Sequence, residues 1–373
     1  VWIPSLSMCS SAASEGVVVQ PPCKAPPAAS SRRRKSILRH PAEARTVAAM
    51  TLVYALLFGL WNFDTALLAS GPVGCAVWAA LYALQCFLAA VTAVIAHNAL
   101  HVPVFNSPLL QRVFQMALTG AYGQPSSVYQ PAHNRSHHRH TSTKKDLMRP
   151  TKLKYKWNVL NMLLAKEHAP GTTAGIKLAF RFYATQWHVR PALVYTFLQE
   201  LVFILVLMAG AIYVSPRRGL MYLYAPQQVG QWFINFINYL QHDGCEVDPH
   251  HQRMNHARNF TGPLFNFVFF NNGYHTVHHL YPGLHWSVLP ERHEKLVAPH
   301  IHPNLCQPCF RKYFWKCLFV REDFLGRPVD PSHDDGEDEP IDFATKVVFE
   351  TDGVDPPASP DDALAAPVKA KSL

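Results

Sequence analysis

Charged residues are scarce in this sequence. They make up 16% of the 373 residues, against about 25% in a typical soluble domain, and hydrophobic residues make up 49%. The deficit comes from four almost uncharged stretches, residues 46–63, 71–96, 192–214 and 220–241. Each is close to the roughly 20 residues that a helix needs to cross the hydrocarbon core of a bilayer. They predict an all-α integral membrane protein with four transmembrane helices, near 46–66, 72–100, 192–214 and 220–241. Buried helices of a large soluble protein are the alternative.

Signatures of a built-in redox cofactor are also lacking. The sequence has no glycine-rich fingerprint for a flavin or nicotinamide nucleotide and no His-Pro-Gly-Gly segment for haem binding. Eight cysteines are scattered along the chain and do not form a disulfide framework. Cys306 and Cys309 form a lone C-x-x-C pair, for which a structural or incidental role is favoured over metal binding or redox chemistry.

The net charge of +9 is concentrated beside the expected helix ends, in residues 32–35 and in the connection from 102 to 190. Short turns would pair the four helices into two hairpins, which places both basic segments on one face of the membrane. The positive-inside rule makes that face cytosolic or its plastid equivalent, although Arg217 and Arg218 lie on the other. Basic residues beside a membrane favour anionic headgroups or acidic partners over nucleic acid.

Histidines gather at the ends of the apolar stretches. They are His97 and His101; His133, His137 and His138; His242; and His275, His278 and His279. Helical residues three or four apart share a face, so each cluster could aim its rings at one point. Imidazole suits iron, zinc, copper or nickel, whereas calcium and magnesium prefer the carboxylates that these clusters nearly lack. Because one ion takes about four to six ligands, nine histidines predict two transition-metal ions.

The spacing of the clusters resembles that of the membrane fatty acid desaturases, over roughly residues 48–320. The family has three histidine boxes and a late Asn or His after the fourth helix. Here the boxes read His97-Asn-Ala-Leu-His101, His133-Asn-Arg-Ser-His137-His138 and His275-Thr-Val-His278-His279, and Asn238 and His242 occupy the late position. The resemblance implies four transmembrane helices and a cytosolic-side helical cap that holds a di-iron centre. It also implies a hydrophobic tunnel for a lipid acyl chain, which is dehydrogenated with O2.

Some neighbouring polar residues leave alternatives open. In the family, Asn238 would reach an iron through water; otherwise it would only hydrogen-bond in the core. His140 could replace a neighbour in its cluster, but its offset favours a supporting or surface role. Asp243, Glu246 and Asp248 follow His242 and could orient a ring, although solvated loop acids are the simpler interpretation.

Electrons for such a reaction must come from a separate protein, since no donor domain is recognisable. Cytochrome b5 and ferredoxin are both acidic, and the stretch from Lys144 to Lys156 beside the second box could dock either one. A loop that faces lipid headgroups is the alternative use of this stretch.

Other functions remain open at this stage. Related di-iron hydroxylases and ketolases that act on carotenoids, alkanes or sphingolipids use comparable clusters. A histidine-rich metal transporter would need ligands at the bilayer midplane rather than beyond helix ends. A non-catalytic lipid-binding relative is disfavoured because all three boxes are intact.

The two ends of the chain differ in composition from the desaturase-like domain, which we place at residues 46–325. Residues 1–45 are rich in Ser, Ala, Pro and Arg, as in targeting segments or disordered tails. Residues 326–373 are acidic and proline-rich, which predicts a solvated, disordered tail. Lys369 and Lys371 resemble a retrieval signal that favours the endoplasmic reticulum over a plastid membrane.

Overall fold

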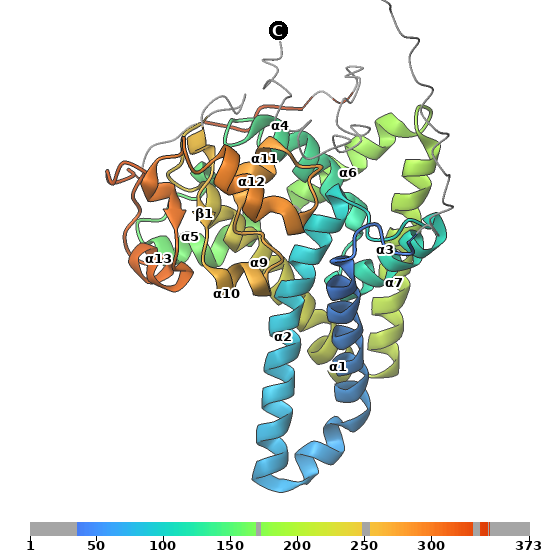
Figure 1. Cartoon of the computed structure of the whole chain (residues 1–373). Helices are drawn as coiled ribbons and strands as arrows, with labels where there is room; N and C mark the ends of the chain where they lie inside the picture. Colours follow the sequence, from blue (N-terminus) through green and yellow to red (C-terminus); the bar gives the residue numbers. More distant parts are fainter. Residues whose placement is uncertain (1–35, 169–172, 248–253, 331–335, 342, 344–373) are drawn as a thin grey trace, which may run out of the picture. The chain divides into compact units, whose positions relative to one another are not determined.

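The computed structural model describes residues 36–168, 173–247, 254–330, 336–341 and 343. This part of the chain is mainly helical, and its one strand pair is short and parallel (Figure 1). The α-helices are α1 (Glu43–Ala69), α2 (Gly71–His101), α3 (Pro108–Tyr122), α4 (His138–His140), α5 (Asn158–Leu164), α6 (Thr173–Gln186), α7 (Pro191–Val214), α8 (Pro216–Arg218), α9 (Ala225–His242), α10 (Pro263–Val268), α11 (His275–Leu280), α12 (Leu289–Leu296) and α13 (Phe310–Cys317). The π-helical segments are η2 (Gln130–His137) and η5 (Gly219–Tyr224). The 3-10 turns are η1 (Ser126–Val128), η3 (Pro150–Lys152), η4 (Ala165–His168), η6 (Met254–His256), η7 (Trp286–Val288) and η8 (Pro303–Leu305).

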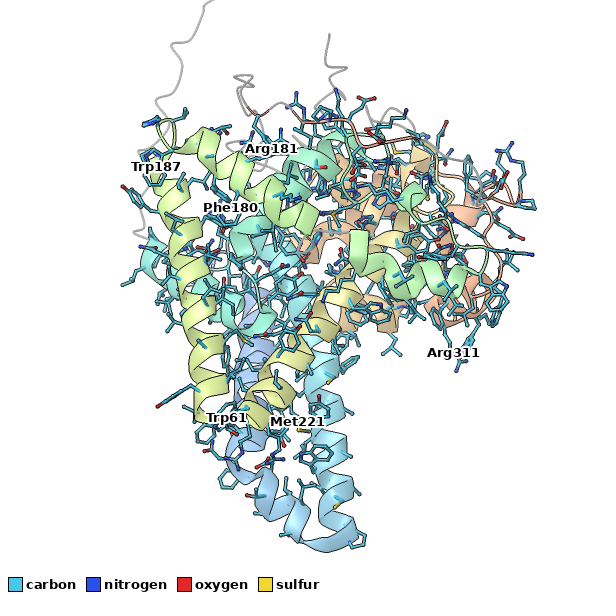
Figure 2. All side chains as sticks on the ribbon, turned by 180° about the vertical axis from the view of Figure 1, so that it is seen from behind. Trp61, Phe180, Arg181, Trp187, Met221 and Arg311 are labelled. Atoms are coloured by element: carbon cyan, nitrogen blue, oxygen red, sulfur yellow. The ribbon has the colours of Figure 1, made fainter. Side chains whose placement is uncertain are left out.

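Three of the described helices, α1, α2 and α7, are long and apolar enough to cross a membrane. Their apolar side chains are largely uncovered by the rest of the protein, as for Phe58, Leu205 and Val206, each at least 60% exposed. A soluble protein would bury side chains of this kind. Figure 2 shows Trp61 and Met221 in the region of these uncovered helices. In length, composition and exposure, α1, α2 and α7 therefore resemble transmembrane helices.

The expected fourth span has a different character. Its residues form η5 and α9 in continuous succession, but α9 carries Gln227, Gln231 and Asn235 and packs against α2. The three amides are buried, and Gln227 donates a hydrogen bond to the carbonyl of Gly120. The count of four spans consequently stays a prediction, since three helices in the described residues meet the criteria of length and apolarity.

The turn between α1 and α2 is tight, with Gly71 at φ +77°, where a residue without Cβ is favoured. Near the same end of the helices, Asp64 is completely buried and forms ion pairs with Arg217 and Arg218. These are the two arginines that oppose the predicted orientation. Their charges are partly balanced inside the protein by this carboxylate.

The helices α2 and α9 approach each other closely at Gly230. A Cβ atom built there would lie 2.6 Å from the carbonyl oxygen of Ala89 in α2. Glycine at this position therefore sets the separation of the two helices whose far ends carry His97, His101 and His242.

We expect Gly230→Ala to destabilise the protein by about 1–3 kcal/mol, because the added methyl group overpacks the α2–α9 contact. Gly210→Ala in α7 is the matched control, since its Cβ meets nothing within 4 Å. Alanine favours a helix over glycine by up to about 1 kcal/mol, so the control should raise the unfolding temperature while Gly230→Ala lowers it. Thermal unfolding in detergent measures both, and equal shifts would contradict the close contact.

The segments after α9 form the remainder of the folded part. Strand β1 (Asn259–Phe260) pairs in parallel with β2 (Cys306–Gln307). Phe260 is fully buried and packs against Phe265 and Phe310, which joins α10 and α13 to the strand pair. Cys306 and Cys309 are free thiols.

Several sequence-based expectations lie outside the described residues. These are the structure of residues 1–35, most of the acidic tail and the retrieval signal at Lys369 and Lys371. Residues 326–330, 336–341 and 343 of the tail are described, and Asp338 and Phe343 among them contact the rest of the folded part.

Candidate metal centre

Four separate segments bring the nine predicted histidines together: the end of α2, the η2–α4 region, the end of α9, and α11. The nitrogens sort into two all-histidine groups, and within each group the ligand atoms lie within 4.8 Å of one another. The first group is His97, His101, His133, His138 and His278. The second group is His137, His242, His275 and His279. No carboxylate or thiol from the described residues joins either group.

The two groups adjoin. His138 of the first group stacks on His279 of the second, with 4.3 Å between ring centroids. His133 and His137 lie 5.4 Å apart in the same way. One group of five imidazoles therefore lies beside one group of four. This arrangement fits two neighbouring candidate metal sites better than one site with surplus histidines.

The division between the groups differs from the expectation that each box aims at one point. His137 and His138 belong to different groups, and so do His278 and His279. Consecutive residues on a helix diverge by about 100°, because the helix has 3.6 residues per turn. Each His-His pair therefore sends one ring to each group.

A π-helix explains the pairing of His133 with His138. The backbone N–H of His138 donates to the carbonyl of His133, five residues earlier, as in a π-helical turn. This brings the two side chains together, and their Nε2 atoms lie 3.0 Å apart. In a regular α-helix, residues five apart would diverge by about 140°.

Distances between nitrogens in the second group fit ligands of a common ion. His275 Nε2 lies 2.9 Å from His242 Nε2 and 3.1 Å from His279 Nε2. Two imidazole nitrogens bound at right angles about 2.1 Å from one ion would be about 3.0 Å apart. His137 Nε2 of this group is buried without a hydrogen-bond partner in the described part of the chain.

In the first group, His101 Nε2 and His278 Nε2 are also buried without a hydrogen-bond partner in the described part of the chain. A buried ring nitrogen without a partner costs free energy, and a metal ion would satisfy it. The donor set of neutral nitrogens suits a transition metal such as iron.

Burial keeps these rings neutral, which metal ligation requires. Desolvation lowers the pKa of His133, His275, His278 and His279 well below its ordinary value, and neighbouring histidines lower it further. Their nitrogens therefore carry lone pairs for a metal at neutral pH.

The second ring nitrogen of several candidate ligands contacts a partner that can orient the ring. His137 Nδ1 donates to Asp146 Oδ2 at 2.9 Å, and both side chains are completely buried. His242 Nδ1 donates to the carbonyl of His256 at 3.0 Å. His279 Nδ1 lies 3.3 Å from the Thr141 hydroxyl. Each contact leaves Nε2 directed toward its group.

Asp146 is a candidate positioning residue that the sequence analysis missed. Burial by itself would raise the pKa of its carboxyl, but His137 and the N–H groups of Ser142 and Met148 hold it below the ordinary value. The carboxylate is thus charged and fixed. The sequence did contain a signal for this residue. Residues 139–156 include seven lysines and arginines, and Asp146 is the one acidic residue in that stretch.

Of the three acids after His242, Asp243 has another partner. Asp243 is buried and pairs with Arg321 at 2.7 Å, so it does not orient a histidine ring. Asp248 lies outside the described residues. His140 joins neither histidine group, as its offset suggested.

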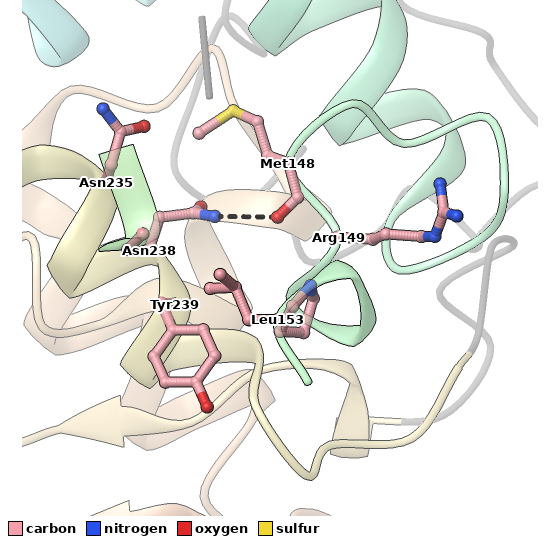
Figure 3. Close-up of a pocket in the computed structure, with 8 residues that line it drawn as sticks. Met148, Arg149, Leu153, Asn235, Asn238 and Tyr239 are labelled. Carbon is pink, nitrogen blue, oxygen red and sulfur yellow. Dashed lines mark hydrogen bonds between the residues drawn. The ribbon is translucent and has the colours of Figure 1, made fainter. Parts of the chain in front are cut away.

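Asn238 lies one helical turn before His242 and lines a cavity of about 20 Å³ with Met148, Arg149 and Tyr239 (Figure 3). Its Nδ2 atom is 3.5 Å from the carbonyl of Met148. The cavity is large enough for about one water molecule and far too small for an acyl chain. Both the water-mediated role of Asn238 and the acyl tunnel stay predictions.

The sequence model of the fatty acid desaturase family matches residues 72–305, more than half of the chain. The chain belongs to the fatty acid desaturase family. The match covers all nine histidines of the two groups. No curated protein and no solved structure matches the chain significantly. Membership supports a desaturase-type oxidoreductase in a membrane.

Proposed function

We propose that the protein is a membrane fatty acid desaturase that introduces a double bond into the acyl chain of an acyl-lipid or acyl-CoA. The observation that carries the proposal is the pair of adjoining all-histidine groups in a chain of this family. Two iron ions, held by the first group and by the second, would supply the activation of O2 that removes hydrogens from an unactivated methylene.

The protein's own residues hold and orient this centre. Asp146, the His256 carbonyl and Thr141 fix the tautomer and direction of three imidazoles of the second group. Neither histidine group contains a carboxylate from the described residues. The Asp146 carboxylate, which is hydrogen-bonded to His137, therefore provides a negative charge next to the second group. Asn238 is proposed as a further ligand through water.

Partners and location follow from the same reasoning. The acyl substrate enters from the membrane, and electrons come from a separate acidic protein such as cytochrome b5 or ferredoxin. The endoplasmic reticulum is the proposed compartment, with a plastid membrane as the alternative. A metal transporter is disfavoured because His97, His101 and His242 lie at helix ends rather than at mid-helix.

Expression in a microbial host tests the proposal. We expect new unsaturated fatty acids in the host lipids by gas chromatography with mass spectrometry, and about two iron ions per purified chain by elemental analysis. Vector-only cells are the control. An oxygenated product would contradict the desaturase assignment in favour of a hydroxylase or ketolase, and zinc without iron would contradict the metal assignment.

A further inference from the structure

Residues 336–339, which are part of an acidic segment toward the C-terminus, lie on the basic stretch beside the second histidine box. Residues 334–339 contain five acids in six positions, whereas residues 139–156 contain seven basic residues and one acid. Asp338 forms ion pairs with Arg149 and with Lys152, the latter at 2.9 Å. The backbone N–H of Glu339 donates to the carbonyl of Lys144 at 3.0 Å, and its carboxylate lies 4.0 Å from Lys145 Nζ.

Two more contacts, one to the backbone and one between aromatic rings, also hold this part of the chain against the folded part. The carbonyl of Gly336 accepts a hydrogen bond from Arg149 Nη2 at 2.9 Å. Phe343 packs edge to face on Phe182 of α6, with 5.3 Å between ring centroids. Contacts of different kinds therefore hold residues 336–339 and residue 343 against the folded part.

The covered surface connects directly to the second histidine group. The backbone N–H of Arg149 lies 3.3 Å from the carbonyl of Asp146, whose carboxylate holds His137. Arg149 also lines the cavity next to Asn238, and Figure 3 shows its guanidinium extending away from that asparagine. A redox protein seated here would have a short covalent and hydrogen-bonded route to a candidate ligand.

We propose that residues 336–339 occupy the docking surface of an acidic electron-donor protein, formed by Lys144, Lys145, Arg149 and Lys152, and compete with the donor for it. The inference rests on the proposed function, because a donor is needed only if the centre performs O2-dependent oxidation. An acidic redox protein fits this surface since the chain itself covers it with carboxylates.

Competition of this kind has a measurable size. The donor binds only chains whose surface is open. Its apparent dissociation constant is therefore the intrinsic constant divided by the fraction of chains in which the surface is open. Asp338 is exposed at 48% of its side chain, so its ion pairs are screened by salt and can open. Neutralising the segment should tighten donor binding at low salt and have little effect at high salt.

The test compares the full chain in phosphatidylcholine nanodiscs with its Asp338→Asn/Glu339→Gln variant. The probes are the reduced soluble domain of cytochrome b5 and a reduced ferredoxin, and dissociation constants are measured by biolayer interferometry at about 50 mM and about 500 mM NaCl. We expect the variant to bind one donor about 3–10-fold more tightly at low salt. In steady-state assays KM for that donor should fall while kcat is retained.

A matched control has the same change in net charge elsewhere. Glu291→Gln/Glu294→Gln removes two exposed acids of α12, of which Glu291 pairs with Lys295. Its donor affinity should equal that of the wild type. Lys152→Gln, added to the Asp338→Asn/Glu339→Gln variant, should weaken donor binding again.

Unchanged or weaker donor binding in the acid-to-amide variant would overturn the proposal, as would equal tightening in the α12 control. Increased binding of a soluble inositol phosphate with unchanged donor affinity would assign the surface to lipid headgroups and also overturn it. Product formation is scored separately. A chain that binds the donor as expected but forms no unsaturated product contradicts the proposed function and not the docking surface.

Discussion

We expect His278→Ala to lose most product formation and to bind one metal ion fewer per chain than the wild type. His278 comes from α11 but belongs to the first group, where its ring lies 4.6 Å from His97 and 4.7 Å from His101. Loss of a partner outside the ligand shell already costs about 10–100-fold in affinity or activity, so loss of a ligand should reduce product by more than about 100-fold.

The metal content distinguishes the groups. We expect His278→Ala and His275→Ala each to bind about one metal ion where the wild type binds about two, because the two residues belong to different groups despite their proximity in sequence. His188→Ala is the control, since His188 is exposed and belongs to neither group. Elemental analysis and gas chromatography check these results, and gel filtration verifies folding. Full product formation by His278→Ala would show that the first group is not a metal site.

The second large effect is expected for Asp146→Asn. The amide keeps the size of the side chain but removes the charge. Its single oxygen cannot replace both Oδ1, which accepts from Met148, and Oδ2, which accepts from Ser142 and His137, and its NH2 group accepts no hydrogen bond. His137 then loses its fixed orientation. We expect activity and metal affinity to fall by about 10–100-fold, measured as product per chain and as metal retained against a chelator.

Glu43→Gln provides the matched control for this prediction. Glu43 also forms a buried carboxylate–histidine pair, with His285 Nε2 at 2.8 Å, but His285 belongs to neither metal group. This variant should lower thermal stability and retain metal and product. If Asp146→Asn and Glu43→Gln had the same effects, Asp146 would stabilise the fold without positioning a ligand.

Much of the candidate site was predictable from sequence because metal ligation depends on residue type and short spacing. All nine histidines predicted as ligands are those that the structure gathers. Uncharged stretches likewise located the three apolar helices, since a membrane span depends on local composition.

The division of the nine histidines into two groups was harder to predict from the sequence. A His-His pair on a helix must diverge, so the assignment of His278 and His279 to different groups could have been anticipated. The pairing of His133 with His138 could not, because it depends on a π-helical hydrogen bond that no local pattern signals.

By itself, the sequence indicated the type of candidate centre: nine neutral nitrogen donors, a number suited to two ions, beside helices apolar enough for a membrane. The tertiary structure decided which histidine joins which group, that the Asp146 carboxylate accepts a hydrogen bond from His137, and that residues 336–339 cover the basic stretch. The physical reason is that composition and spacing act over a few residues. The contact between Asp338 and Arg149 joins positions 189 residues apart, and packing of the whole chain alone brings such positions together.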